Sequence, residues 1–285
     1  MVKKIFFLFA ILLSFLNLTW AKDIKNHKDI PTVSVSIPPQ AFFVEKIAGD
    51  TVKINIILPP NTNEHHFEFK PSVMKKLEQS EIYFTIGLEF EKIFIDKFHH
   101  NFPNLEIVNM QKNIKLLDFQ DSHHQKDPHT WLDPVLVQTM ALNIYDALIQ
   151  KYPENKNLYK ENLNKFLAEL DNLNLQISSK LENIKQKEFI VYHPSWAYFA
   201  KRYHLIQIPV ENLGKEPKIK ELKQLITFIK DKHIKTIFVQ NGFPENAAKT
   251  LAHQCDAQIY IINHLSKDWE KELLKVSDAL SKALK

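Results

Sequence analysis

Histidines and carboxylates are concentrated between Asp121 and Pro134, in the stretch DSHHQKDPHTWLDP. These fourteen positions hold three histidines and three aspartates, namely His123, His124, His129, Asp121, Asp127 and Asp133. Imidazole nitrogens and carboxylate oxygens are side-chain groups that bind zinc and related transition metals. The composition of this stretch therefore predicts one part of a metal site.

Two more histidines lie next to the predicted ends of strands. His65 lies in the loop after one strand, and His193 directly follows another, Glu188–Tyr192. In open α/β sheets, ligands bind beyond the carboxyl ends of the strands. We therefore expect His65, His129 and His193 to meet in one cleft. Three neutral imidazoles, with a carboxylate or a water as the fourth ligand, form a zinc arrangement.

Carboxylates near these histidines could complete the site or orient it. Glu64 is the best placed, because it adjoins His65 and brings negative charge to a dication. Asp127 and Asp133 could instead accept the second ring N–H of a ligand histidine and so fix its tautomer. Their structural alternatives are a turn residue before a proline and a charge at the N-terminus of a helix.

Other chemistries find little support in the sequence. The nucleotide-binding patterns GxxxxGK[ST] and GxGxxG are absent, as are HExxH, GxSxG and CxxC. Cys255 is the only cysteine, so the chain has no intramolecular disulfide, and its place at the end of an apolar helix predicts a packing role. The net charge of +4 is too balanced to indicate nucleic-acid binding. His123 and His124 are predicted to be solvated or to form a weak metal-collecting pair.

The first 21 residues have the pattern of a cleavable signal peptide. Lys3 and Lys4 precede the apolar run Ile5–Leu18, and small residues stand before Lys22. The run is shorter than the roughly 20 residues of a membrane-spanning helix. No cysteine near the cleavage point could carry a lipid anchor. We therefore expect a soluble periplasmic protein that begins near Lys22.

Strands and helices alternate in two halves of the remaining chain, which indicates parallel sheets covered by helices. The strands expected in the first half are Thr32–Ser36, Val52–Leu58, Glu81–Ile86 and Leu105–Val108. Those expected in the second half are Glu188–Tyr192, Leu205–Val210, Thr236–Gln240 and Gln258–Ile262. The prediction is two (β/α)4-type domains, each with a parallel-rich sheet.

One long helix is expected between the halves. Residues 155–186 contain no Gly or Pro, and their apolar residues recur every three or four positions. A helix of that length would extend about 48 Å and could hold two domains at a fixed distance. The alternative is an ordinary long packing helix. The expected organisation is an N-terminal α/β domain at 22–154, the rigid linking helix at 155–186 and a C-terminal α/β domain at 187–285.

Four ordered motifs resemble those of a known family. DPHTWLDP is similar to DPHxWLDP, EHHFEFKPS to (D/E)PHxYEPxPSD, and LGKEPKIKELKQL to GKEPSPxxL, while YHPSWAYFAKRY resembles the segment of a third histidine. These are motifs of the metal-specific substrate-binding proteins of bacterial ABC uptake systems, and the chain most resembles the zinc-uptake ZnuA branch. The resemblance covers Pro31 to Lys285.

The resemblance implies that His65, His129 and His193 are metal ligands. Many members take a fourth ligand from an Asp in a late DPL segment, but here the matching residues are Asn263-His264-Leu265. Some zinc-binding members use a Glu before the first histidine, where Glu64 stands. The predicted ligands are therefore His65, His129, His193 and Glu64, with water or the Asn263 loop as alternatives at the fourth position.

The implied function is capture of Zn²⁺ between two domains and delivery to an inner-membrane ABC permease, by a monomer and without catalysis. Manganese-binding members have an acidic residue in place of the third histidine, so His193 favours zinc. Zinc affinity should fall as the pH approaches ~6.5, because ligand imidazoles must be neutral. The alternatives are a manganese or iron binder of the same family, a zinc-dependent hydrolase with Glu64 as base, and an adhesin without a metal role.

Overall fold

The structure, a computed structural model, describes residues 30–59, 62–64, 67–119, 122–211, 215, 217–243 and 245–285. Of residues 122–124 and 245 it describes the backbone only. The predicted signal peptide and His65 lie outside the described residues. Within the described part of the chain, no helix is both long and apolar enough to cross a membrane.

The first half contains a four-stranded sheet in the order β2-β1-β3-β4, with every neighbouring pair parallel. Its strands are β1 (Thr32–Val35), β2 (Lys53–Ile56), β3 (Ile82–Thr85) and β4 (Glu106–Asn109). The helices between them are α2 (Pro38–Ala48), α3 (Pro71–Glu78) and α4 (Glu89–Asn101). Both α2 and α3 begin with proline, whose missing N–H costs nothing in the first turn.

The second half repeats this topology. Its sheet has the order β10-β9-β7-β8, again with parallel pairs, so that in both halves the first and third strands are neighbours at the centre. The strands are β7 (Glu188–Val191), β8 (Ile206–Pro209), β9 (Thr236–Gln240) and β10 (Gln258–Ile262). The helices are α7 (Ala197–Arg202), α8 (Ile219–Asp231), α9 (Glu245–Cys255) and α10 (Trp269–Ala283). The predicted fold class is confirmed.

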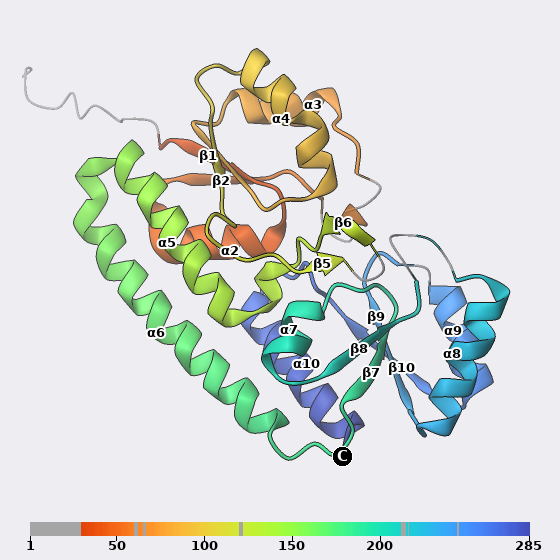
Figure 1. The fold of residues 1–285 in the computed structure, drawn as a ribbon. Helices are drawn as coiled ribbons and strands as arrows, with labels where there is room; N and C mark the ends of the chain where they lie inside the picture. Colours follow the sequence, from red (N-terminus) through yellow and green to blue (C-terminus); the bar gives the residue numbers. More distant parts are fainter. Residues whose placement is uncertain are drawn as a thin grey trace, which may run out of the picture. The chain divides into compact units, whose positions relative to one another are not determined.

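The long helix α6 (Lys156–Leu181) links the two halves (Figure 1). Its buried residues follow the predicted spacing, and the helix packs against α5 (Pro134–Lys151), α2 and α10. The helix ends five residues before the predicted limit at Gln186. There the backbone N–H groups of Lys185 and Gln186 donate to Leu284 O at the end of α10, so the chain has already turned toward β7. The predicted domain limits stay a prediction.

A small hairpin precedes α5 and was not expected from the sequence. It pairs β5 (Asp118–Phe119) with β6 (Ser122–Lys126) in antiparallel fashion. Backbone bonding continues past the strands, since the N–H of Asp127 donates to Leu117 O. The segment before His129 is therefore held by backbone hydrogen bonds and is not an irregular loop.

Two tryptophans belong to a hydrophobic cluster that spans both halves, while a second cluster lies within the second half. The indole N–H of Trp131 donates to His264 O at 2.8 Å, and that of Trp269 donates to Trp131 O at 2.7 Å. Trp269 also packs edge-on against Phe43 of α2. Both indoles are almost completely buried. This packing fixes the segment after His129 to the segment that carries His264.

Candidate metal centre

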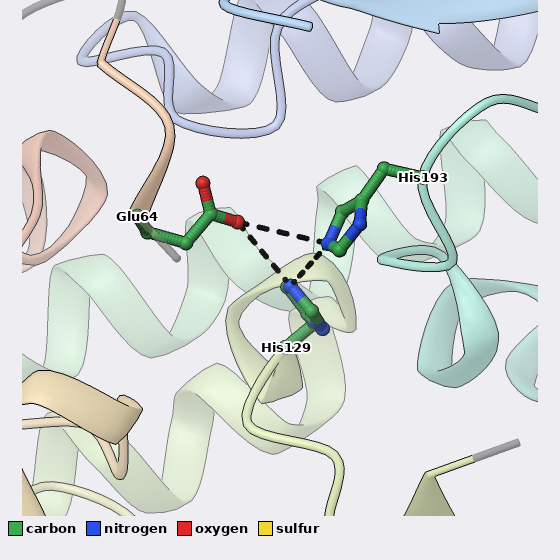
Figure 2. Close-up of side chains that lie close together, drawn as sticks. All are labelled: Glu64, His129 and His193. Carbon is green, nitrogen blue, oxygen red and sulfur yellow. Dashed lines mark hydrogen bonds and ion pairs between the residues drawn. The ribbon is translucent and has the colours of Figure 1, made fainter. Parts of the chain in front are cut away.

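Glu64, His129 and His193 form a buried cluster (Figure 2). Glu64 lies between β2 and α3, His129 directly precedes a short 3-10 helix at Thr130–Leu132, and His193 lies two residues after β7. One possible ligand atom of each residue lies within 4.8 Å of those of the other two. Three residues that lie far apart in the sequence are therefore neighbours in the folded chain.

The distances suit a small tetrahedral cation. His129 Nε2 and His193 Nε2 are 3.4 Å apart, and Glu64 Oε1 lies 3.6 Å from the first and 3.8 Å from the second. Bonds of ~2.0–2.1 Å in a tetrahedral zinc site place ligand atoms about 3.3 Å apart. Two imidazole nitrogens and a carboxylate oxygen thus stand close to the spacing that zinc requires.

Carboxylates hold both imidazoles in the orientation a ligand needs. Asp127 Oδ1 lies 2.7 Å from His129 Nδ1 and also accepts the His129 backbone N–H at 2.9 Å. Glu211 Oε1 lies 2.5 Å from His193 Nδ1. In each neutral imidazole the proton is then on Nδ1, and the lone pair of Nε2 points toward the other histidine and Glu64. Asp127 therefore lies where it can accept the second ring N–H of His129, which is one of the two roles that the sequence predicted for it.

The charges of the cluster suit a cation. Burial alone would raise the pKa of Glu64, but attraction to His264, the nearby ring of His129 and a hydrogen bond with His264 hold that pKa well below its ordinary value. Burial would lower the pKa of His129, yet the carboxylates of Asp127 and Glu64 raise it to about 9. Burial lowers the pKa of His193 well below its ordinary value despite the attraction of Glu64. The cluster therefore presents an ionised carboxylate and a neutral imidazole, and His129 must lose a proton to bind a metal.

Glutamine side chains fix the backbone beside both histidines. Gln240, the last residue of β9, accepts the His193 N–H at 3.1 Å and donates to His193 O at 2.5 Å. Gln111, after β4, donates to Pro128 O and to Thr130 Oγ1, both at 2.8 Å. The two histidine loops are thereby attached to the two sheets, which reduces the rearrangement that metal binding requires.

Aromatic rings pack against both imidazoles. Phe243 is nearly parallel to His193, with an interplanar angle of 18° and ring centroids 4.7 Å apart. Trp131, from the DPHTWLDP motif, lies 5.0 Å from His129. Both aromatic side chains are buried. They keep water from the outer faces of the imidazoles and limit ring rotation.

Asp133 was a candidate to orient a ligand histidine, and the Asn263 loop was a candidate for the fourth ligand, but both residues make other contacts. Asp133 Oδ1 accepts the N–H of Val135 at the start of α5, and the carboxylate also pairs with Arg202, with Oδ2 2.9 Å from Nη2. This is the helix-terminal role weighed as its alternative. Asn263 Oδ1 accepts the N–H of Leu265 within a turn, so this amide oxygen is used locally. The backbone of His123 and His124 lies in β6, and their side chains lie outside the described part.

Glu211 and His264 were missed as neighbours of the site. His264 Nε2 lies 2.9 Å from Glu64 Oε1, and its side chain is buried. Both residues occupy the position that made His193 a candidate, since each stands two residues after a parallel strand, β8 or β10. Both residues would have been candidates if the residues that follow every predicted parallel strand had been considered in the same way as His193.

Two parallel sheets joined by a long helix, with a buried Glu-His-His cluster contributed by both halves, define a metal-binding protein of the substrate-binding type. Residues 33–284 match the family described as zinc-uptake complex component A, periplasmic (ZnuA), and the chain belongs to this family. As a ZnuA-family protein it is a binding component of a zinc-uptake system and not an enzyme. This removes the hydrolase alternative.

Similar proteins span nearly the whole chain. The high-affinity zinc uptake system protein ZnuA of Bacillus subtilis (strain 168) is 26% identical in an alignment of 243 positions, which covers 80% of this chain and 76% of that protein. A putative metal-binding protein of Chlamydia trachomatis serovar D is 28% identical in an alignment of 281 positions, which covers 96% of this chain and 98% of that one.

Solved structures agree with the fold. A crystal structure of ZnuA matches with a TM-score of 0.87 and 36% identity, covering 90% of this chain and all of that chain. A ZnuA deletion mutant with zinc bound matches with a TM-score of 0.86 and 37% identity, covering 90% and 98%.

Proposed function

We propose that this chain captures Zn²⁺ in the periplasm with His129, His193, Glu64 and His65, and delivers the ion as cargo to an inner-membrane ABC permease. The observation that carries the proposal is the separation of 3.4 Å between two Nε2 atoms whose opposite ring nitrogens are held by carboxylates. His65 is included on the strength of its family motif and its position next to Glu64.

Zinc is favoured by the chemistry of the donors. Two buried imidazoles and one carboxylate give a site rich in nitrogen, whereas manganese prefers sites made mainly of oxygen ligands. The zinc bound in the similar ZnuA mutant structure supports the same assignment. A chain isolated from the periplasm with manganese or iron in this site would favour the family alternative instead.

Capture and release are proposed to depend on loops rather than on separation of the two halves. The indole N–H groups of Trp131 and Trp269 form hydrogen bonds that link the two halves. The Arg202–Asp133 ion pair also joins α7 to the start of α5. These contacts oppose a wide opening motion. Release would then require displacement of the segment that carries Glu64 when the permease docks.

Periplasmic location and a monomeric state complete the proposal. The family is described as periplasmic, and residues 1–21 have the pattern of a cleavable signal peptide. Mass spectrometry of the secreted chain would test cleavage before Lys22, and light scattering of the zinc-loaded chain would test the monomer.

The metal assignment is tested by zinc titration of His129→Ala against His253→Ala. His129 is a buried member of the cluster, whereas His253 is an exposed histidine on α9. We expect His129→Ala to weaken zinc binding by at least about 100-fold, more than the loss of a residue that only orients a ligand. His253→Ala should bind zinc like the parent. Equal affinity in both variants would contradict the proposed function.

A further inference from the structure

Hydrogen bonds hold the backbone at His264 in place. Its carbonyl oxygen accepts the Trp131 indole N–H at 2.8 Å, and the preceding Asn263 forms a turn in which its Oδ1 accepts the N–H of Leu265 at 3.1 Å. The side chain is 1% exposed. The buried side chain directs its Nε2 toward Oε1 of Glu64.

The contact joins distant parts of the chain. His264 Nε2 lies 2.9 Å from Glu64 Oε1, across 200 positions of sequence and between the two halves. The same oxygen faces His129 Nε2 at 3.6 Å and His193 Nε2 at 3.8 Å. Within the described part of the chain, the group of three possible ligand atoms that all lie within 4.8 Å of one another comes from Glu64, His129 and His193, and His264 does not belong to it. His264 therefore acts on the carboxylate rather than on the position of the cation.

We propose that His264 is a positioning residue of the metal centre, which donates Nε2–H to Glu64 and presents the carboxylate as a ligand through one oxygen. The proposal rests on the proposed zinc-binding function. It assigns to Glu64 the kind of partner that Asp127 and Glu211 provide for the two histidines. Ligating carboxylates, like ligating histidines, depend on such hydrogen bonds for their orientation.

The proposed role has a consequence for metal selectivity. The hydrogen bond from His264 holds Glu64 with Oε1 facing the Nε2 atoms of His129 and His193, so this oxygen is the one presented to the cation. Binding through a single oxygen keeps the coordination number at four, as zinc prefers. Manganese prefers octahedral oxygen coordination and gains from a carboxylate that can bind through both oxygens. His264 should therefore favour zinc over manganese.

The test compares two amides that differ by one methylene. His264→Gln keeps an N–H donor near the position of Nε2, whereas the side chain of His264→Asn is too short to reach Glu64. His264→Leu removes the donor completely, and His253→Leu on α9 is the control for loss of a histidine. Each purified chain is titrated with zinc and with manganese against a chelator, and its Co²⁺ complex is examined by absorption spectroscopy. The melting temperature without metal shows whether each variant folds.

We expect His264→Gln to bind zinc within about threefold of the parent, and His264→Asn and His264→Leu to lose about 10–100-fold. The ratio of zinc to manganese affinity should fall in the same two variants. Their Co²⁺ spectra should change from intense tetrahedral bands to the weaker bands of higher coordination. If His264→Leu fails to fold, His264→Asn provides the same comparison.

Two results would overturn the proposal. Parental zinc affinity and Co²⁺ spectra in His264→Asn would show that Glu64 needs no positioning by His264. A loss in His264→Gln as large as in His129→Ala would make His264 a ligand instead. The proposed function is judged separately, because it fails only if the parent chain does not bind zinc or if His129→Ala binds it unchanged.

Discussion

Asp127 and Glu211 determine which nitrogen of each histidine is available to a metal. Each carboxylate lies within hydrogen-bond distance of Nδ1, so the proton of the neutral ring is held there and Nε2 is left as the ligand atom. The negative charge also makes each imidazole a stronger donor to the cation. The choice of ligand nitrogen and its donor strength therefore depend on Asp127 and Glu211 as well as on the two histidines.

Zinc affinity is predicted to depend on pH through His129. The pKa of His129 is raised to about 9, so in the absence of metal its ring is protonated at neutral pH. Zinc requires the neutral ring, and protons therefore compete below pH 9. Affinity should rise by about tenfold per pH unit between pH 6 and 8. A chelator competition at three pH values measures this.

Proton release provides an independent check of that dependence. Calorimetry at pH 7.5 in two buffers of different ionisation enthalpy should report about one proton released per zinc bound. His193 should add none, because its pKa lies well below the ordinary value. Zinc affinity that is unchanged between pH 6 and 8 would contradict the assignment of His129 as a ligand.

At the scale of single residues, the sequence was informative where chemistry and position coincided. That His129, His193 and Glu64 lie together could be predicted, because each is a metal-binding residue type near the end of a strand or the start of a helix. His264 could not be placed against Glu64, since 200 positions separate them and no local pattern links them. Glu211 stands in the same position after β8, two residues beyond the strand, but its role as the partner of His193 Nδ1 depends on a contact that no local pattern shows.

At the scale of secondary structure, the loop after β3 supports the loop of His129. Gly87 has φ of +81°, a backbone conformation that residues other than glycine rarely adopt. A Cβ atom there would lie 2.4 Å from Oε1 of Gln111, whose amide nitrogen donates to Pro128 and Thr130. The absence of a side chain at position 87 thus allows Gln111 to hold the residues on both sides of His129.

Gly87→Ala is predicted to damage both stability and zinc binding. The left-handed backbone and the clash with Gln111 should together lower the free energy of unfolding by about 1–3 kcal/mol. Displacement of Gln111 should also weaken zinc affinity. Urea unfolding and zinc titration measure the two effects.

Gly49→Ala is the matched control for that substitution. Gly49 also has positive φ, +56°, but the nearest atom to its Cβ position is Asn162 Nδ2 at 3.9 Å. Only the backbone cost, about 1 kcal/mol, should appear, with zinc affinity unchanged. Equal effects of the two substitutions on zinc binding would show that Gln111 does not hold the His129 loop.

Most helices and strands were predictable because their patterns are local. The spacing of apolar residues in α6 and the alternation of β-rich and helical segments appear directly in the sequence. The hairpin β5–β6 was missed because its strands are short and polar, with pairing that only the folded chain reveals. The end of α6 was misplaced because it depends on backbone bonds to Leu284.

At the scale of the whole molecule, both sheets have the same strand order, with their first and third strands adjacent. This is the place in an open α/β sheet where crossovers leave on opposite sides and a ligand can bind. The two central strands of the second sheet are β7 and β9. His193 follows β7, and Gln240, which forms hydrogen bonds with the His193 backbone, is the last residue of β9. The alternation of elements predicted parallel sheets, but strand order depends on long-range pairing that no local pattern encodes.

The central claim is that zinc lies between the two halves, bound by Nε2 of His129 and His193 and by one oxygen of Glu64. Anomalous diffraction at the zinc edge, from crystals grown with one equivalent of zinc, tests it most directly. The predicted result is a single strong peak within about 2.0–2.2 Å of these three atoms. A peak at the His123–His124 hairpin, with none between His129 and His193, would contradict the claim.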